Sequence, residues 1–108
     1  MKQNSVQLIG YVGGDPKIII AKNGSKLARV RVATHYKTKT AGDEKKYITT
    51  WHDVVAWEMQ ADYAERSFVK GSRILVGGCI CYRTYCDTKG NIRYVAEIKA
   101  DTLINLDR

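Results

Sequence analysis

Apolar and polar residues alternate over much of the chain, and this alternation constrains the fold more than any other feature. The pattern is clear at residues 6–10, 28–32 and 47–57. A period of two places successive side chains on opposite faces of an extended strand, so one face of each segment can be buried. Strands therefore outnumber helices, and the sequence predicts an all-β protein.

Turn-forming residues separate these segments. The sequence GGDP follows the first strand at residues 13–16, NG at 23–24 suits a two-residue hairpin, and TKGN at 88–91 suits another. Five long strands result, with a short extra strand at residues 17–21.

One segment, residues 59–69, has helical spacing, with Met59, Tyr63 and Ala64 on one face and Gly71 just beyond its end. It lies between the third and fourth long strands. Three strands, a helix and two strands are the order of a five-stranded OB-fold Greek-key barrel. We expect residues 1–108 to form a single domain of this kind.

The charge of the chain indicates its partner. Eighteen Lys and Arg residues against 11 Asp and Glu give a net charge of +7 and a pI near 9.4. Such an excess favours nucleic acid, with an anionic membrane surface as the second candidate. Neither a signal peptide nor an apolar run long enough for a membrane span is present, so a cytoplasmic, nucleoid-associated protein is expected.

Aromatic residues recur at one parity of the third strand. Trp51 and Trp57 share one side, whereas the other parity is predicted to face the core and comprises Ile48, Thr50, Val54 and Ala56. Packing of the two indoles in the core is the competing interpretation. The small residues at the opposite parity favour exposed indoles.

Basic residues accompany the aromatic ones elsewhere. Arg29 and Arg31 are predicted to point outward from the second strand, with Tyr36 at its end on the same surface. The hairpin of the last two strands presents a further set, comprising Tyr82, Arg83, Tyr85, Arg93 and Tyr94. Stacking on aromatic rings contributes about 1–3 kcal/mol per base and tolerates any sequence, while Lys and Arg follow the phosphates.

Little in the sequence indicates an enzyme. It contains no glycine-rich phosphate loop and no HExxH motif, and His52 and Asp53 are adjacent on a strand and so point apart. Cys79, Cys81 and Cys86 lack a zinc-site spacing and are predicted to be reduced thiols, although a metal or redox role stays open. We expect no cofactor and no bound metal.

Five short motifs then occur in a familiar order: VQLIGYVGGDP at residues 6–16, VAT at 32–34, WHDVVAW at 51–57, KGS at 70–72 and DTKGNIRY at 87–94. Over residues 5–106 the chain resembles the bacterial single-stranded DNA-binding protein family. The resemblance implies a homotetramer that coats single-stranded DNA during DNA replication, recombination and repair without catalysis.

Matching the motifs residue by residue carries the stacking positions of the family to Trp51, Trp57 and Tyr85, and less directly to Tyr36. His52 corresponds to a position near a subunit contact, and Asp53 stands where a basic residue is common. From the residues and the resemblance together, the expected DNA contacts are Trp51, Trp57, Tyr85, Tyr36, Arg29, Arg31, Lys70, Arg83 and Arg93.

The sequence lacks the flexible linker and acidic tip of typical family members, so recruitment of repair or replication proteins by such a tail is not expected of this form. Two alternatives remain open. One is a short interaction module similar to the primosomal relatives of the family, and the other is an RNA-binding OB domain.

Overall fold

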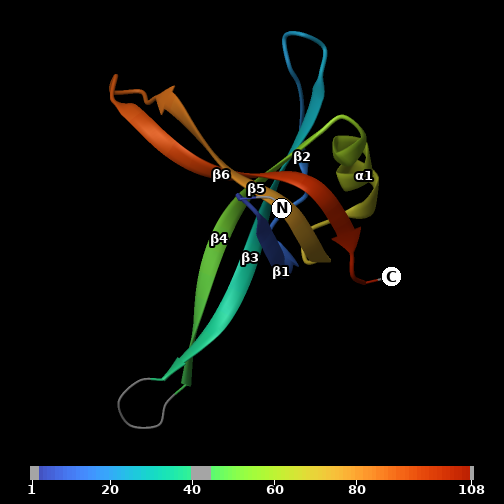
Figure 1. Cartoon of the computed structure of the whole chain (residues 1–108), viewed down its shortest axis with the longest axis vertical. Helices are drawn as coiled ribbons and strands as arrows, with labels where there is room; N and C mark the ends of the chain where they lie inside the picture. Colours follow the sequence, from blue (N-terminus) through green and yellow to red (C-terminus); the bar gives the residue numbers. More distant parts are fainter. Residues whose placement is uncertain (1–2, 40–44, 108) are drawn as a thin grey trace.

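A computed structural model describes residues 3–39 and 45–107. It confirms a mainly β chain with one short helix (Figure 1). In order along the chain, the elements are β1 (Val6–Val12), β2 (Lys17–Ile20), β3 (Lys26–Lys39), β4 (Lys45–Trp57), α1 (Met59–Ser67), β5 (Arg73–Cys86) and β6 (Ile92–Asn105). The short strand and the helix therefore both end before the expected residues.

The strands close into a barrel. The sheet order is β1-β5-β6-β4-β3-β2, and β1 also pairs with β3 at Tyr11 and Val12, which joins the two ends of the five long strands. The other pairings are antiparallel, but β4 and β6 run parallel where Val54 and Val55 meet Ile98 and Lys99. The predicted five-stranded barrel is confirmed, with β2 attached to the edge of β3.

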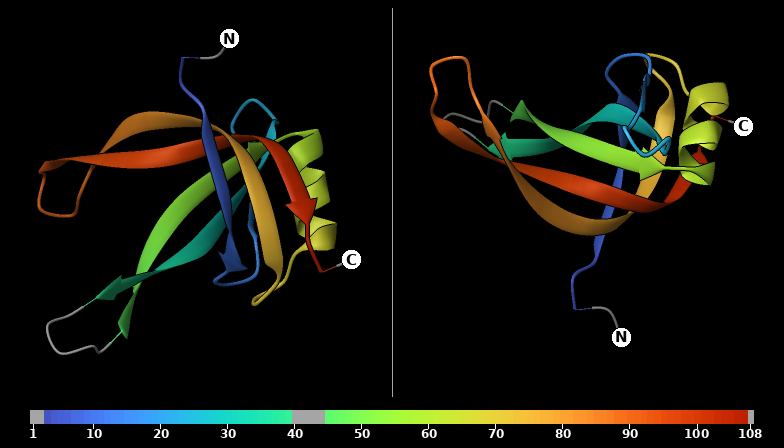
Figure 2. Two further views of the ribbon diagram at one scale, coloured as in Figure 1. Left: turned by 60° about the horizontal axis from the view of Figure 1, so that its bottom comes forward. Right: turned by 90° about the horizontal axis from the view of Figure 1, so that it is seen from above.

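Two hairpins extend beyond this barrel. The β3–β4 pairing continues to Lys39 and Lys45, and the β5–β6 pairing continues to Cys86 and Ile92. Figure 2 shows both arms projecting away from the side that carries α1. The prediction that Ile48 and Thr50 face the core is wrong, because both lie on the β3–β4 arm beyond the barrel and both are exposed.

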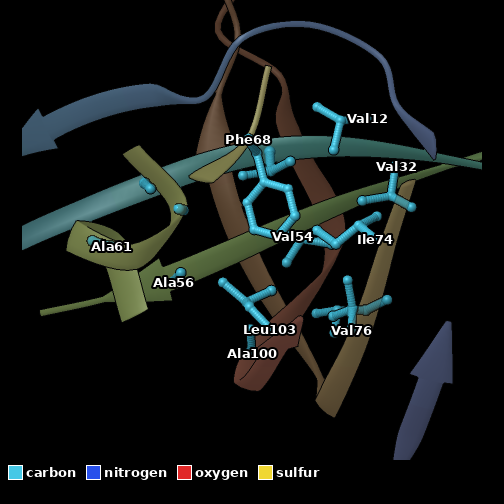
Figure 3. Packing of buried hydrophobic residues seen from close by; sticks show 14 residues of the cluster. Val12, Val32, Val54, Ala56, Ala61, Phe68, Ile74, Val76, Ala100 and Leu103 are labelled. Atoms are coloured by element: carbon cyan, nitrogen blue, oxygen red, sulfur yellow. The ribbon is translucent and has the colours of Figure 1, made fainter. Parts of the chain in front are cut away.

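The core confirms the predicted alternation within the barrel itself. The buried set is drawn from every long strand and from the helix (Figure 3), and its largest members are Val12, Val30, Val32, Val54, Phe68, Ile74 and Val76. The pairing register shifts at Gly77 and Gly78, where the sheet bends. A Cβ atom on Gly78 would lie 2.0 Å from the carbonyl oxygen of Lys99. The close approach of β5 to β6 at this point therefore requires glycine.

Helix α1 covers one end of the barrel. Its buried residues are Ala61 and Ala64, and Phe68 just beyond it is 2% exposed. Lys26 at the start of β3 forms ion pairs with Asp62 and Glu65, both at 2.7 Å, which anchor the helix. Met59, expected on the buried face, instead projects into solvent. No helix in the described ranges has the length and apolar character to cross a membrane.

Candidate nucleic-acid interface

The register of β3 and β4 divides their side chains between two faces. Arg31 pairs with Asp53, Ala33 with Trp51 and Arg29 with Val55, so these side chains share one side of the sheet. We call this the outer face. The inner face is the side of Val30, Val32 and Val54, which lines the barrel core and continues onto the arms.

Trp51 is the central aromatic side chain of the outer face. The residue is 50% exposed, and the guanidinium carbon of Arg31 lies 4.7 Å from the centre of its ring. The ring rests on the backbone of Gly13, where an added Cβ atom would come within 2.4 Å of Trp51 Cζ3. A side chain at residue 13 would therefore displace the indole, and glycine permits this close approach.

A groove of about 380 Å³ lies beside Trp51. Its walls come from the β1–β2 connection, β2, β3 and β4, and include Gly13, Gly14, Asp15, Lys17, Arg29, Arg31, Trp51 and Asp53. The sequence predicts residues 13–16 to be a turn and part of the first motif, but it does not indicate a wall of the DNA site there, and it does not single out Lys17. Asp15 Oδ1 also accepts a hydrogen bond from the Lys70 backbone N–H at 2.9 Å, which ties predicted contact Lys70 to the rim.

Trp57 belongs to the same face but to its opposite end. The residue is 37% exposed and pairs with Leu27, close to β2. Six residues of strand separate it from Trp51, a distance of roughly 20 Å. The two indoles are thus brought onto one surface without forming one stacking site.

The β5–β6 arm carries the next group of predicted contacts. Arg83 pairs with Val95, and Tyr85 pairs with Arg93, which places the three predicted side chains on one face of the arm. The Arg83 guanidinium lies 5.8 Å from the centre of the Tyr85 ring, and Tyr85 is exposed. The remaining aromatic residues of the hairpin, Tyr82 and Tyr94, alternate to the inner side and are also exposed.

Glu97 of β6 joins the β3–β4 sheet to this arm. Its carboxylate binds Arg83 Nε at 3.0 Å and also binds Arg29 Nη1, which reaches across β4. Burial tends to raise the pKa of Glu97, but the hydrogen bonds from Arg83 and Arg29 outweigh it and lower that pKa. Two of the predicted phosphate-binding cations therefore share one internal counter-ion, which no sequence pattern indicates because Glu97 is far from both in the chain.

Asp87 organises the tip of the same arm. Its Oδ1 accepts the backbone N–H groups of Lys89 and Asn91, and its Oδ2 accepts Arg93 Nε at 2.9 Å. The bond to the Asn91 backbone and the Arg93 guanidinium lower the pKa of Asp87. The turn at Gly90, with φ of 81°, is thereby fixed beside a cation of the predicted interface.

Tyr36 does not share the surface of Arg29 and Arg31, and that expectation is corrected. It pairs with Ile48 and therefore lies on the inner face, 55% exposed. The reason is parity: β3 continues without a bulge to Lys39, so an even-numbered residue cannot rejoin the odd-numbered arginines. A strand bound to the outer face would reach Tyr36 only by passing around the β3–β4 arm.

His52 is half-buried on the inner face, where its Nε2 lies 2.9 Å from Thr34 Oγ1. As expected, Asp53 points to the other side, with Oδ1 3.8 Å from Arg31 Nε. No group of three or more His, Cys, Asp or Glu side chains within residues 3–39 and 45–107 is arranged to hold a metal ion. The placement of His52 at a subunit contact stays a prediction.

Known protein families include one whose model matches nearly the whole chain. The model of the single-strand binding protein family matches residues 3–106. The chain belongs to this family. The match covers all six strands and α1, and it confirms the resemblance inferred from the five sequence motifs.

Relatives in the family are similar over most of the chain. Single-stranded DNA-binding protein 1 of Xylella fastidiosa is 39% identical over 99 residues, which cover 90% of this chain and 72% of that protein. The single-stranded DNA-binding protein of Bacteroides thetaiotaomicron is 34% identical over 105 residues, which cover 95% of this chain and 65% of that protein. Both relatives are therefore longer than the chain.

Among solved structures, a Plasmodium falciparum SSB in complex with ssDNA superposes on the chain with a TM-score of 0.86. The two are 30% identical, and the alignment covers 99% of this chain and 97% of the other. The arms are therefore included in the similarity, together with the barrel.

Proposed function

We propose that this chain binds single-stranded DNA without sequence specificity, stacking bases on aromatic rings of the outer face and neutralising phosphates with Lys and Arg. The observation that carries the proposal is Trp51. Its ring is held against Gly13 and Arg31 yet stays half exposed beside a groove that Lys17, Arg29 and Arg31 help to line. An exposed ring next to cations suits the stacking of a base whose phosphate is neutralised nearby. The ssDNA complex of the Plasmodium falciparum relative supports the same ligand.

In this proposal the strand crosses the β3–β4 sheet and continues onto the β5–β6 arm. Trp51, Trp57 and Tyr85 supply the stacking surfaces, while phosphate contacts come from Arg29, Arg31, Lys70, Arg83 and Arg93. Incoming phosphates compete with Glu97 and Asp87 for three of these guanidinium groups. Tyr36 makes an additional contact where a longer strand turns around the β3–β4 arm.

The proposal extends to the biological role and assembly. The whole chain acts as one OB-fold domain, without catalytic activity, that protects exposed strands during DNA replication, recombination and repair in the cytoplasm. It assembles as a homotetramer with His52 near a subunit contact. The names of the bacterial relatives and their identities of 34–39% support the DNA-binding role.

A titration with oligo-dT, oligo-rU and duplex DNA tests the ligand. Oligo-dT is expected to quench the tryptophan fluorescence strongly, because bases stack on exposed indoles, whereas duplex DNA keeps its bases paired and stacked. Equal quenching by duplex would contradict the stacking model. Tighter binding of oligo-rU than oligo-dT would assign the domain to RNA instead.

A further inference from the structure

Two cysteines of β5 lie next to each other on the face that also carries Arg83. Cys79 and Cys81 are two positions apart on one strand, so the pleat turns both side chains to the same side. Their sulfur atoms are 3.8 Å apart. Both are free thiols, with Cys81 exposed and Cys79 half-buried. The proposed DNA contacts make no use of this pair.

The separation of the two sulfur atoms matches two corners of a thiolate metal site. In a tetrahedral zinc site each sulfur lies about 2.3 Å from the metal, which places two sulfurs about 3.8 Å apart. The β5 strand thus already holds Cys79 and Cys81 at the distance that one shared ion requires. Its pairing with β6 runs through this segment and keeps the two side chains in register.

The neighbouring side chains restrict the kind of ion. Lys99 lies directly across from Cys79. The hydrogen bond with Cys79 and burial raise the pKa of Cys81, and the charge of Lys99 opposes only part of this rise, so a metal ion has to displace the thiol protons. Glu97 lies across from Cys81, but its carboxylate is bound by Arg29 and Arg83. The donors on offer are therefore two soft sulfur atoms without a free carboxylate. This set selects soft, thiophilic ions over Mg²⁺ or Ca²⁺.

We propose that Cys79 and Cys81 form a bidentate site for one soft, thiophilic metal ion. Water or a small anion completes the coordination, since the described residues offer no third ligand. On binding, the two thiol protons pass to solvent as two sulfur–metal bonds form. The site lies on the same face of β5 as the proposed DNA contact Arg83, and metal binding can be tested without DNA.

Cadmium is a suitable probe, because thiolate binding produces sulfur-to-cadmium charge-transfer absorbance in the ultraviolet. The full chain is titrated with Cd²⁺ in DNA-free buffer with a non-thiol reductant. The background variant is Cys86→Ser, which removes the thiol on the opposite side of the strand. We expect one Cd²⁺ per chain in this background. Cys79→Ser and Cys81→Ser, each added to it, should abolish the band.

A second titration distinguishes a site that depends on the folded strand from the general affinity of thiols for cadmium. The Cys86→Ser chain should bind Cd²⁺ at least about tenfold more tightly when folded than in denaturant, because only the folded strand holds the sulfurs together. Unchanged melting curves for the serine variants exclude misfolding as the cause of a lost band. Equal affinity in denaturant, or a band that survives Cys81→Ser, would overturn the proposal.

Discussion

Replacing Trp51 by alanine should weaken the binding of a short oligo-dT while leaving the protein folded. The ring is half exposed on the outer face, so a base can stack on it. Loss of one stacked base costs about 1–3 kcal/mol. At about 1.4 kcal/mol per factor of ten, the dissociation constant should rise by roughly 5- to 150-fold.

The cost of the same substitution in folding free energy follows from what the ring covers. A fully buried aromatic side chain removes about 150–250 Å² from water, so the covered half of Trp51 corresponds to about 100 Å². At about 25 cal/mol per Å², the loss is at most about 2.5 kcal/mol. A typical domain has about 5–15 kcal/mol of stability, and the variant should therefore remain folded.

The matched control is Tyr36→Ala, which removes an equally exposed ring from the inner face. The assay is the fluorescence anisotropy of a labelled oligo-dT of about 8 nucleotides, within the site size of one OB fold. A labelled strand is needed because Trp51→Ala removes part of the intrinsic signal. Tyr36→Ala should change this affinity less than about twofold, but should weaken a longer strand that turns around the arm.

Two results would refute this account. If Tyr36→Ala costs as much as Trp51→Ala on the short strand, the assignment of faces is wrong. If Trp51→Ala melts far below wild type while its folded fraction binds normally, the indole serves packing and is not a stacking surface.

Three further predictions concern charge, core and assembly. Glu97→Gln should tighten oligo-dT binding and steepen its salt dependence by about 0.7 log units for each of Arg29 and Arg83 that gains a phosphate. The lowered pKa of Glu97 means that its stabilising contribution is present above the ordinary glutamate pKa and is lost as pH falls through the lowered value. The melting temperature of Glu97→Gln should therefore fall less than that of wild type as pH is lowered through that window. An identical dependence of melting temperature on pH in both proteins would contradict the ion-pair role. Phe68→Ala should lower the free energy of unfolding by about 3–5 kcal/mol, because the ring is fully buried between α1 and the barrel. Denaturant titration measures this loss. A loss under about 1 kcal/mol would show that the end of the barrel is not packed around the ring. Light scattering should give a tetrameric mass that His52→Lys shifts toward smaller species, and a monomeric wild type at micromolar concentration would dismiss the proposed assembly.

The strand alternation predicted most of the barrel and the central part of the candidate interface. Trp51 and Val54 have opposite parity, and the structure places the first on the outer face and the second in the core. This agreement has a local cause. The pleat of a strand alternates side chains whatever surrounds it, so an uninterrupted strand can be divided into two faces from its sequence.

The errors came from where the strands continue relative to the barrel. Ile48 and Thr50 have core parity but lie exposed on an arm beyond the barrel, because the parity of a strand is independent of where the barrel ends. For Tyr36 the signal was present, since its parity differs from that of Arg29 and Arg31. The prediction placed Tyr36 at the end of the second strand, whereas β3 continues to Lys39.

By itself the sequence determined the number and order of the long strands and the position of the helix. It also determined the parity of Trp51, Trp57 and the arginines of the second strand. All of these depend on neighbours along the chain. Only the tertiary structure decided the partners of those residues. Gly13 beneath Trp51, Glu97 between Arg29 and Arg83, and the groove that includes Lys17 all join segments far apart in sequence. Such contacts depend on strand register and barrel closure, which bring the β1–β2 connection and β6 to the central strands, and alternation along a single strand carries no record of that pairing.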